Sequence, residues 1–489
     1  MPSWVGKFFA PNKGRFLRSI RLENFKAFKD SQPIPLRPIT ILVGKNSAGK
    51  SSIIKAILAS SQTCSAALPD GSDFRLIGDY TNLGTFSDTV HGGDQSNYFA
   101  ITFEIGPPNT SANLDKNFSF RYRYSSAESS PLAAKFAGFN ARYGTTVICS
   151  GGRFERKPKN RPQRGKRCTR AKFNSEDIFG EDPSQSDEMP AFVKELQESM
   201  RSLGEKHYGD SHEEVTGSNY HLFLDDFAID IGRKVFTPGL NLYDNYPFFG
   251  PIESASIFLD RALSRSIYLG PLRDEPSREA RLAQSSGNRV GVRGEDLPTM
   301  LHVRRDNVEF MEKFNSQLNA LGIAESARTS ASYMRGEDGE ELETGFVKVM
   351  VNRDGTPRSL MDLGFGTSQV LPIVFELSLR KNRIILLEQP ELHLHPAAQS
   401  EIGDLLKFSM DQGNQLIVET HSANLIERIR RLIRNGELDN NAANIIYIRQ
   451  DDSGQGICDS IGFNEDGTFA DTWPEDDFFG EREREIFDW

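Results

Sequence analysis

The stretch PITILVGKNSAGKSSIIKAIL, residues 38–58, decides the fold class of this 489-residue chain. Its centre, GKNSAGKS at 44–51, matches the pattern GxxxxGK[ST] at every fixed position. A β-rich run ends at this loop, and IIKAILASSQ (53–62) predicts a helix after it. A strand, a glycine loop and a helix in this order are what a phosphate-binding loop requires, which disfavours the alternative of a chance glycine loop.

This loop carries the groups that bind a nucleotide together with its metal. Gly44 and Gly49 let the main chain fold around phosphates, and the helix N-terminus adds positive potential. We expect Lys50 to reach the β- and γ-phosphates of ATP, and the Ser51 hydroxyl to complete the Mg²⁺ shell. The residues expected to hold the nucleotide here are Gly44, Lys45, Asn46, Ser47, Ala48, Gly49, Lys50, Ser51 and Ser52.

Two later strand ends supply candidate catalytic residues. In RIILLEQPELHLHP (383–396) an apolar run delivers Glu388 to its end, where parallel sheets bind ligands and a carboxylate can hold Mg²⁺. In ETHSANL (419–425), His421 follows the next predicted strand and is placed to contact a γ-phosphate or position water. The alternatives are an ordinary edge carboxylate and a structural histidine.

A glycine-rich segment, MDLGFGTSQVLP (361–372), precedes the helix that leads to Glu388. Gly364 and Gly366 permit close approach of the main chain, and Ser368 lies at the helix start, so this is a candidate second phosphate-binding loop. One chain has one GxxxxGK[ST] loop, so a second phosphate loop suggests that another copy of the chain completes the site. An ordinary glycine turn with a serine N-cap is the alternative.

The order of predicted elements favours an α/β fold with a mostly parallel sheet. From residue 366 onward, helices alternate with strands; the helices are expected at 368–380, from 396, and at 422–434, and the strands at 383–388, 415–420 and 444–450. Earlier elements are less regular. They are two strands around a turn in 18–43, β-rich 97–150, a loop over 151–190, helices at 189–204, 251–264 and 307–321, a strand at 266–270, and a hairpin over 345–364 turning at Asp354-Gly355.

The four motifs occur in the order of the ABC-type ATPases of the SMC and RecF group, which LENFKAF…ITILVGKNSAGKSS also resembles. LEQPELHLHP, GFGTSQVLP, YLGPLRDEPSR (268–278) and the tail WPEDDFF (473–479) resemble the AAA-family ATPases related to the overcoming-lysogenization-defect (OLD) proteins. The ATPase subunits of the Septu, PARIS and some retron anti-phage defence systems belong to that wider set. The resemblance covers roughly 17–95 and 265–489.

This resemblance implies an ABC-type P-loop ATPase head that closes as a dimer on two ATP molecules. Glu388 would be the metal-side carboxylate and His421 the switch histidine, while His395 would fall near the D-loop. Gly366, Ser368 and Gln369 would cap ATP on the partner subunit. The expected domains are an N-terminal extension (1–16), an N-terminal lobe (17–95), an inserted β-rich and helical region (96–260) and a C-terminal lobe with an ordered acidic aromatic tail (261–489).

One position departs from the family pattern. A catalytic Glu is expected directly after the metal-side acid, and here that residue is Gln389. An amide can orient a water molecule but cannot accept its proton. Either Glu391 or another group serves as the base, or hydrolysis is slow. A slow site favours a long-lived ATP-bound dimer, which suits a sensor better than a motor.

Composition restricts the partners. The net charge of −10 argues against coating nucleic acid with the whole surface. The segment RFERKPKNRPQRGKRCTRAKF (153–173) holds ten Lys/Arg and one Glu, so it is either a DNA- or RNA-binding loop or a solvated flexible one. The candidates for phosphate contact are Arg161, Arg164, Lys166, Arg167 and Arg170. No apolar run is long enough to cross a membrane, and four scattered cysteines suit the cytoplasm.

Three functions remain open at this point. The first is a defence ATPase that senses phage and controls a separate effector such as a nuclease, because the 68 residues after His421 are too few for the TOPRIM domain of nuclease-bearing relatives. The second is a RecF-like DNA repair ATPase, which the basic segment favours. The third is a scaffold that binds ATP but hydrolyses little of it, which Gln389 favours.

Overall fold

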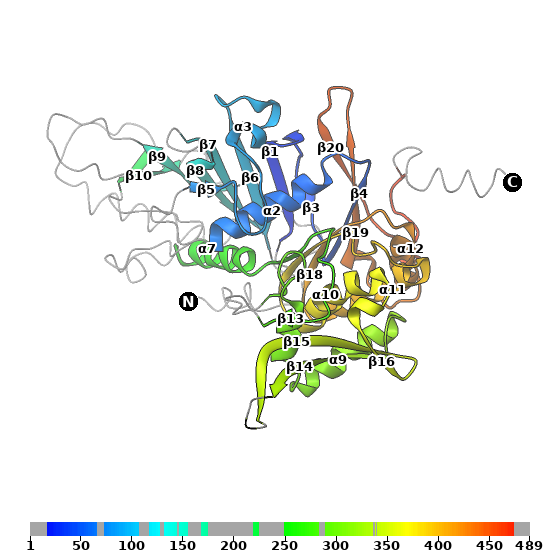
Figure 1. Ribbon diagram of the computed structural model, residues 1–489. Helices are drawn as coiled ribbons and strands as arrows, with labels where there is room; N and C mark the ends of the chain where they lie inside the picture. Colours follow the sequence, from blue (N-terminus) through cyan, green and yellow to red (C-terminus); the bar gives the residue numbers. More distant parts are fainter. Residues whose placement is uncertain are drawn as a thin grey trace. The chain divides into compact units, whose positions relative to one another are not determined.

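The computed structural model describes residues 17–65, 73–106, 117–127, 132–143, 146–154, 168–174, 219–223, 249–282, 289–335, 338 and 340–473. The described residues divide into two compact units, and Figure 1 follows the chain through both. One unit holds 17–35 and 55–265, and the other holds 36–54 and 266–489. Each unit is built on its own large sheet.

The second unit contains a six-stranded, mostly parallel sheet in the order β12-β17-β18-β4-β19-β20. Its strands are β12 (Ile267–Leu269), β17 (Ile384–Glu388), β18 (Gln415–Glu419), β4 (Ile39–Gly44), β19 (Ala443–Gln450) and the antiparallel edge strand β20 (Gly456–Ile461). Every residue of β4, β17 and β18 is buried, as expected where helices cover both faces of a parallel sheet. In Figure 1 the blue β4 lies beside the orange β19, so the sheet joins distant parts of the chain. The predicted α/β class with a mostly parallel sheet is confirmed.

Helices of this unit bury apolar side chains in one core with the strands. They are α8 (Leu297–Val303), α9 (Val308–Ala320), α10 (Phe365–Leu379), α11 (Pro396–Asp411) and α12 (Ala423–Arg434). In α12, a stripe of leucines and isoleucines at helical spacing is buried, and the Ser422 hydroxyl accepts a hydrogen bond from the Leu425 main chain as N-cap. In α10, by contrast, every residue from Thr367 to Ser378 is buried, rather than one stripe only.

A smaller four-stranded sheet belongs to the same unit. Its strands are β13 (Ala280–Arg281), β14 (Ser326–Arg335), β15 (Glu341–Arg353) and β16 (Thr356–Ser359). Between β15 and β16, Asp354 and Gly355 have φ angles of 54° and 69°. Two consecutive positive φ angles suit a tight hairpin turn, so the predicted Asp-Gly turn is confirmed.

The first unit contains a ten-stranded antiparallel sheet in the order β11-β10-β9-β8-β7-β6-β1-β2, with β3 on β1 and β5 on β8. The strands are β1 (Ser19–Phe25), β2 (Phe28–Asp30), β3 (Ile34–Pro35), β5 (Asp73–Arg75), β6 (Tyr98–Ile105), β7 (Phe118–Ser126), β8 (Ala133–Tyr143), β9 (Thr146–Phe154), β10 (Cys168–Asn174) and β11 (Asn219–Phe223). Side chains of β7 alternate between buried aromatic and more exposed polar residues, which gives the sheet one apolar and one polar face.

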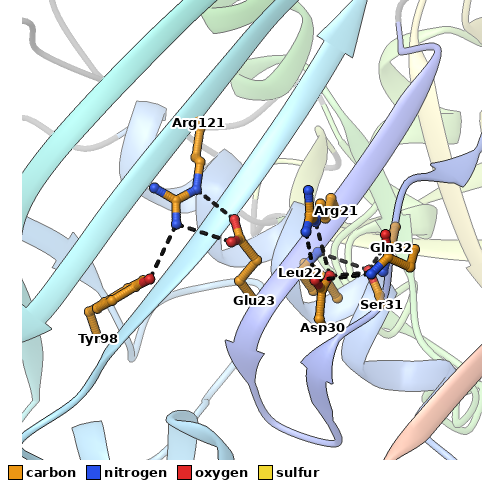
Figure 2. A network of polar contacts seen from close by, with 8 residues as sticks. All are labelled: Arg21, Leu22, Glu23, Asp30, Ser31, Gln32, Tyr98 and Arg121. Carbon is orange, nitrogen blue, oxygen red and sulfur yellow. Dashed lines mark hydrogen bonds and ion pairs between the residues drawn. The ribbon is translucent and has the colours of Figure 1, made fainter. Parts of the chain in front are cut away.

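Paired charges occupy that polar face (Figure 2). Arg121 donates two hydrogen bonds to the Glu23 carboxylate, at 2.6 and 3.0 Å, and one at 3.5 Å to the Tyr98 hydroxyl. Arg21 holds Asp30 in the same two-pronged way, at 2.9 and 2.6 Å. From here on, the name polar face refers to Arg21, Glu23, Asp30, Tyr98 and Arg121. In this group each carboxylate is neutralised by a guanidinium.

The remaining helices are α2 (Lys50–Ser65), α3 (Phe86–Thr89) and α7 (Phe249–Ser264). The predicted helices at 251–264 and 307–321 are confirmed by α7 and α9. Single 3₁₀ turns lie at His91–Gly93, Leu360–Asp362 and Asn440–Ala442. The helix expected at 189–204 lies outside the described residues. None of the helices that the structure describes is long and apolar enough to span a membrane.

Two predictions about strands were wrong. The two strands expected around one turn in 18–43 belong to different sheets, because β1 pairs with β6 while β4 pairs with β18 and β19. Residues 151–190 were expected to be a loop, but β9 extends to Phe154 and β10 pairs with it. The main-chain ladder of the large sheet imposes strand structure on a segment whose composition favours a loop.

The two compact units divide the chain at other positions than the expected domain boundaries. Strands β1 and β6, on either side of the boundary at 95 and 96, pair within one sheet, whereas β4 joins the sheet of 266–489. At the other end, Trp473 of the acidic tail packs its ring on Tyr447 and Phe469, with centroids 5.7 and 5.2 Å apart. The rest of the tail, 474–489, lies outside the described residues.

Candidate functional site

The GxxxxGK[ST] loop joins β4 to α2, as its sequence predicts. Gly44 and Gly49 have φ angles of 141° and 116°, which favour glycine, and a Cβ on Gly44 would collide with the main-chain oxygen of Ile448. Lys50 Nζ lies within the loop, where it donates hydrogen bonds of 2.8 Å to the carbonyl oxygens of Gly44 and Lys45. Burial lowers the pKa of Lys50, although the nearby Glu419 carboxylate acts to raise it.

Two glutamates end neighbouring parallel strands beside this loop. Glu388 closes β17 and Glu419 closes β18, and the two are paired in register. Tyr268 of β12 donates a hydrogen bond of 2.9 Å from its hydroxyl to Glu388 Oε1. Ser51, in the first turn of α2, donates one of 3.0 Å to Glu419 Oε2. The parallel sheet therefore brings both carboxylates and the serine hydroxyl to one edge.

Gln389, directly after Glu388, is held by its main chain. Its φ angle of 46° is unusual for a residue other than glycine, and its N–H donates a hydrogen bond of 2.8 Å to the Glu419 carbonyl. The guanidinium of Arg273 donates to the carbonyl oxygens of Glu388 and Gln389, at 2.8 and 3.1 Å. Arg273 is 3% exposed, and this burial lowers its pKa to about 10. These bonds fix the main chain of residue 389.

Glu391 and His421 are linked to each other. Glu391 Oε1 accepts a hydrogen bond of 2.8 Å from the main-chain N–H of His421. Burial raises the pKa of Glu391, and partial desolvation, with a smaller contribution from Lys50, lowers that of the solvent-accessible His421. One carboxylate oxygen of Glu391 binds the main chain of the histidine loop, and its other oxygen, Oε2, is buried without a hydrogen-bond partner.

The glycine-rich segment forms the start of α10. Gly366 packs so closely on the main-chain oxygen of His393 that a Cβ there would collide with it, and the Phe365 ring meets the His393 ring edge-on at 4.8 Å. Ser368 Oγ donates 2.7 Å to the Phe365 carbonyl. The Gln369 amide, 1% exposed, bonds both the N–H and the carbonyl of Arg273. The exposed side chains of this segment are therefore those of Met361, Asp362 and Phe365, whereas Thr367 to Pro372 are buried.

The structure brings Lys50, Ser51, Glu388, Gln389 and His421 to one edge of the parallel sheet. His395 caps α11 instead, accepting a hydrogen bond of 3.4 Å from the Ala397 N–H. The basic candidates Arg161, Arg164, Lys166 and Arg167 lie outside the described residues, and Arg170 is in β10 with its main chain paired to Gly152 and Phe223.

The sequence-based interpretation missed three residues: Tyr268, Arg273 and Glu419. A signal for Glu419 was present, because IILLE and QLIVE both end an apolar strand with a glutamate. Tyr268 and Arg273 lie 120 and 115 residues before their partner Glu388, and nothing local connects them to it.

The donor set fits a hard divalent cation. Hydroxyl and carboxylate oxygens are the ligands that Mg²⁺ prefers, and it usually keeps several waters and phosphate oxygens besides one or two protein groups. Ser51 with Glu388 or Glu419 would supply that number. Among the described residues no cluster of three or more His, Cys, Asp or Glu side chains could hold a metal.

Two family models match the chain on either side of the central region. Residues 16–123 match a model described as "AAA ATPase domain", and residues 209–427 match one described as "AAA domain, putative AbiEii toxin, Type IV TA system". The first model includes the GxxxxGK[ST] loop, and the second includes Gln369, Glu388 and His421. The nucleotide-binding loop and the strand-end residues of the site thus lie in the parts of the chain that are similar to AAA ATPase domains.

A curated relative gives the narrower relationship. The "Old nuclease" of Escherichia phage P2 is 27% identical over 128 residues, 24% of this chain and 20% of that protein, so the chain matches about a fifth of the relative's length. Over this stretch the chain is similar to an OLD nuclease, in line with the resemblance seen in the motifs.

Solved SMC heads are also similar. An SmcHead bound to the C-winged helix domain of ScpA is 13% identical with a TM-score of 0.40, covering 91% of this chain and 98% of that one. The Smc head with an extended coiled coil from Pyrococcus furiosus, bound to the C-terminal domain of ScpA, is 15% identical with a TM-score of 0.39, covering 91% and 96%. Scores this low carry no argument about function.

Proposed function

We propose that the chain binds ATP with Mg²⁺, hydrolyses it slowly, and forms a homodimer that closes on two nucleotides. The observation that carries this proposal is the convergence of Lys50, Ser51 and two strand-end glutamates at one sheet edge. Lys50 would bind the β- and γ-phosphates, Ser51 and Glu388 would hold Mg²⁺, and His421 would contact the γ-phosphate. When bound, Mg²⁺ would neutralise charge on the phosphates.

Slow hydrolysis is supported by Gln389. The main chain of Gln389 is fixed by Arg273 and Glu419, and its side-chain amide has no capacity to take a proton. The nearest alternative base, Glu391, already binds the main chain of His421. Without a carboxylate at position 389, hydrolysis would be slow and the ATP-bound dimer would persist.

We further propose that this persistent dimer controls a separate effector, such as a nuclease, in a cytoplasmic anti-phage defence system. Support comes from the matched model, whose description names a toxin–antitoxin component, and from the relationship to a phage nuclease. Expressing the chain with its neighbouring gene and measuring phage plating efficiency tests this role. Lys50→Ala should abolish any protection; equal protection by parent and variant would rule out ATP-dependent control.

Mixing two inactive variants tests the shared site. Lys50→Ala removes the phosphate contact, and Phe365→Arg alters an exposed ring at the start of α10, where 42% of the residue is accessible. A mixed dimer keeps one intact composite site of two, so an equal mixture should regain about a quarter of the parent ATPase activity. Mass photometry with tagged chains must show that mixed dimers form. If they form without recovering activity, the site is not shared.

A second candidate is a RecF-like role in which DNA binding is the main function. The ten basic residues of 153–173 favour it. Replacing Arg161, Arg164, Lys166, Arg167 and Arg170 with Ser should weaken DNA or RNA binding and reduce its salt dependence, because each lost phosphate contact lowers the slope by about 0.7–0.9. If the parent binds neither nucleic acid at low salt, this candidate fails.

A further inference from the structure

The last residues of β17 and β18 share a position. The two strands are parallel, and their register pairs Glu388 with Glu419. Neighbouring strands lie about 4.8 Å apart, and paired residues point to the same face of the sheet. Both side chains are nearly buried, with 8% of Glu388 and 6% of Glu419 exposed. Two carboxylates are thus held side by side at the edge that faces the phosphate-binding loop.

Of the two carboxylates, Glu419 is the one bonded to the Ser51 hydroxyl, which is the group expected to bind the metal. Ser51 Oγ donates its hydrogen bond to Glu419 Oε2, across 368 positions of sequence. Glu388, the residue that the motif order assigns to the metal, receives its hydrogen bond from Tyr268. Burial and the charge of Glu388 raise the pKa of Tyr268, so its hydroxyl stays protonated and remains a donor.

Each carboxylate has both a hydroxyl and a cation near it, because Lys50 interacts with Glu419 and Arg273 with Glu388. Hydroxyls hydrogen-bond a carboxylate without neutralising it, and the buried guanidinium of Arg273 is directed to main-chain carbonyls of residues 388 and 389. The ammonium of Lys50 interacts with Glu419 but hydrogen-bonds the carbonyls of its own loop. Adjacent buried anions repel each other, and a divalent cation relieves that repulsion.

We propose that Glu419 is a second acidic group of the divalent-cation site, on the Ser51 side, and that it sets how tightly the cation is held with the nucleotide. This inference rests on the proposed ATP binding. Glu388 and Glu419 then act as a pair from neighbouring strands, and the cation has a carboxylate on either side of the β17–β18 ladder.

Cation retention provides the test, with Mn²⁺ as the probe in place of Mg²⁺. Electron paramagnetic resonance of Mn²⁺, at saturating non-hydrolysable ATP analogue, compares the parent with Glu419→Gln, Glu388→Gln and Ser51→Ala. Glu427→Gln, on the surface of α12, is the matched control. We expect Glu419→Gln to weaken Mn²⁺ retention about 10- to 100-fold, the usual effect of removing a group that supports a metal ligand, and the control to match the parent.

Nucleotide affinity in EDTA separates the possible failures. Glu419→Gln should bind the analogue without metal at least as well as the parent, because it removes a negative charge near the phosphates, and this also shows that the variant is folded. A parent that binds no analogue under any condition defeats the proposed function itself. A parent whose Mn²⁺ retention equals that of Glu419→Gln defeats only this inference. Unchanged retention with lost single-turnover hydrolysis also overturns it and makes Glu419 a proton acceptor instead.

Discussion

The two large sheets use their charged residues in opposite ways. On the polar face of the antiparallel sheet, Glu23 and Asp30 each receive two hydrogen bonds from one guanidinium (Figure 2). The parallel sheet has a nucleotide edge, defined by Lys50, Ser51, Glu388, Gln389 and Glu419. There, Glu388 accepts a hydrogen bond from the Tyr268 hydroxyl, and Glu419 accepts one from the Ser51 hydroxyl. Acids neutralised in pairs stabilise a surface modestly, whereas acids that accept from hydroxyls beside a phosphate-binding loop are placed to meet a ligand.

Lys50→Ala is the strongest way to test this contrast. It should lower ATP affinity by about 10²–10³-fold, because charge-assisted hydrogen bonds are each worth about 1.5–3 kcal/mol. Arg121→Ala removes a positive charge of the polar face and should leave ATP affinity unchanged. Equilibrium binding of a fluorescent ATP analogue measures both. Equal losses in the two variants would mean that the two regions do not differ as described.

Gln389→Glu adds one more acid at the nucleotide edge and tests whether an added carboxylate there increases the rate of ATP hydrolysis. General-base assistance is worth about 10²–10⁴-fold, so this substitution should speed single-turnover hydrolysis by about 10² and shorten the life of the ATP-bound dimer. Glu391→Gln is the companion variant. Fast hydrolysis by the parent that Glu391→Gln abolishes, with no effect of Gln389→Glu, would make Glu391 the base and end the slow-hydrolysis proposal.

Arg273→Lys and Arg121→Lys compare buried and partly exposed guanidinium groups directly. At position 273, lysine keeps the charge but cannot span the two carbonyls that Arg273 binds. Arg273→Lys should therefore lower the free energy of unfolding by about 2–3 kcal/mol. At Arg121, which is partly exposed, the same change should cost less than about 1 kcal/mol. Urea unfolding provides both values. A larger loss at Arg121 would contradict the distinction.

Asp30→Asn should have the smallest effect and a defined pH dependence. Burial acts to raise the pKa of Asp30, but hydrogen bonds from Arg21 and from the Gln32 main chain lower it overall. A carboxyl with a lowered folded-state pKa stabilises the protein above its unfolded value, here near 3.8, and loses that effect as pH falls further. The variant should be less stable by under about 1 kcal/mol at pH 7, and the difference should close in acid.

Local patterns predicted much of the fold and part of the site. The GxxxxGK[ST] loop and the strands ending at Glu388 and Glu419 follow from contiguous residues, as does the turn at Asp354-Gly355. Sheet membership did not follow, because the pairing of β1 with β6 rather than β4 depends on the whole ladder. The bond from Ser51 to Glu419 spans 368 positions. No periodicity or spacing rule reaches across such a separation, so the tertiary structure was needed to find it.

Arg273 supports residue 389 without touching its side chain. Its hydrogen bonds end on main-chain oxygens, which every amino acid provides, and the N–H of residue 389 is likewise bound through the main chain. An exchange between amide and carboxylate at this position therefore leaves the supporting contacts intact. Evolution could adjust the lifetime of the nucleotide-bound form through one codon, since Gln and Glu codons differ by a single base, while the rest of the site stayed the same.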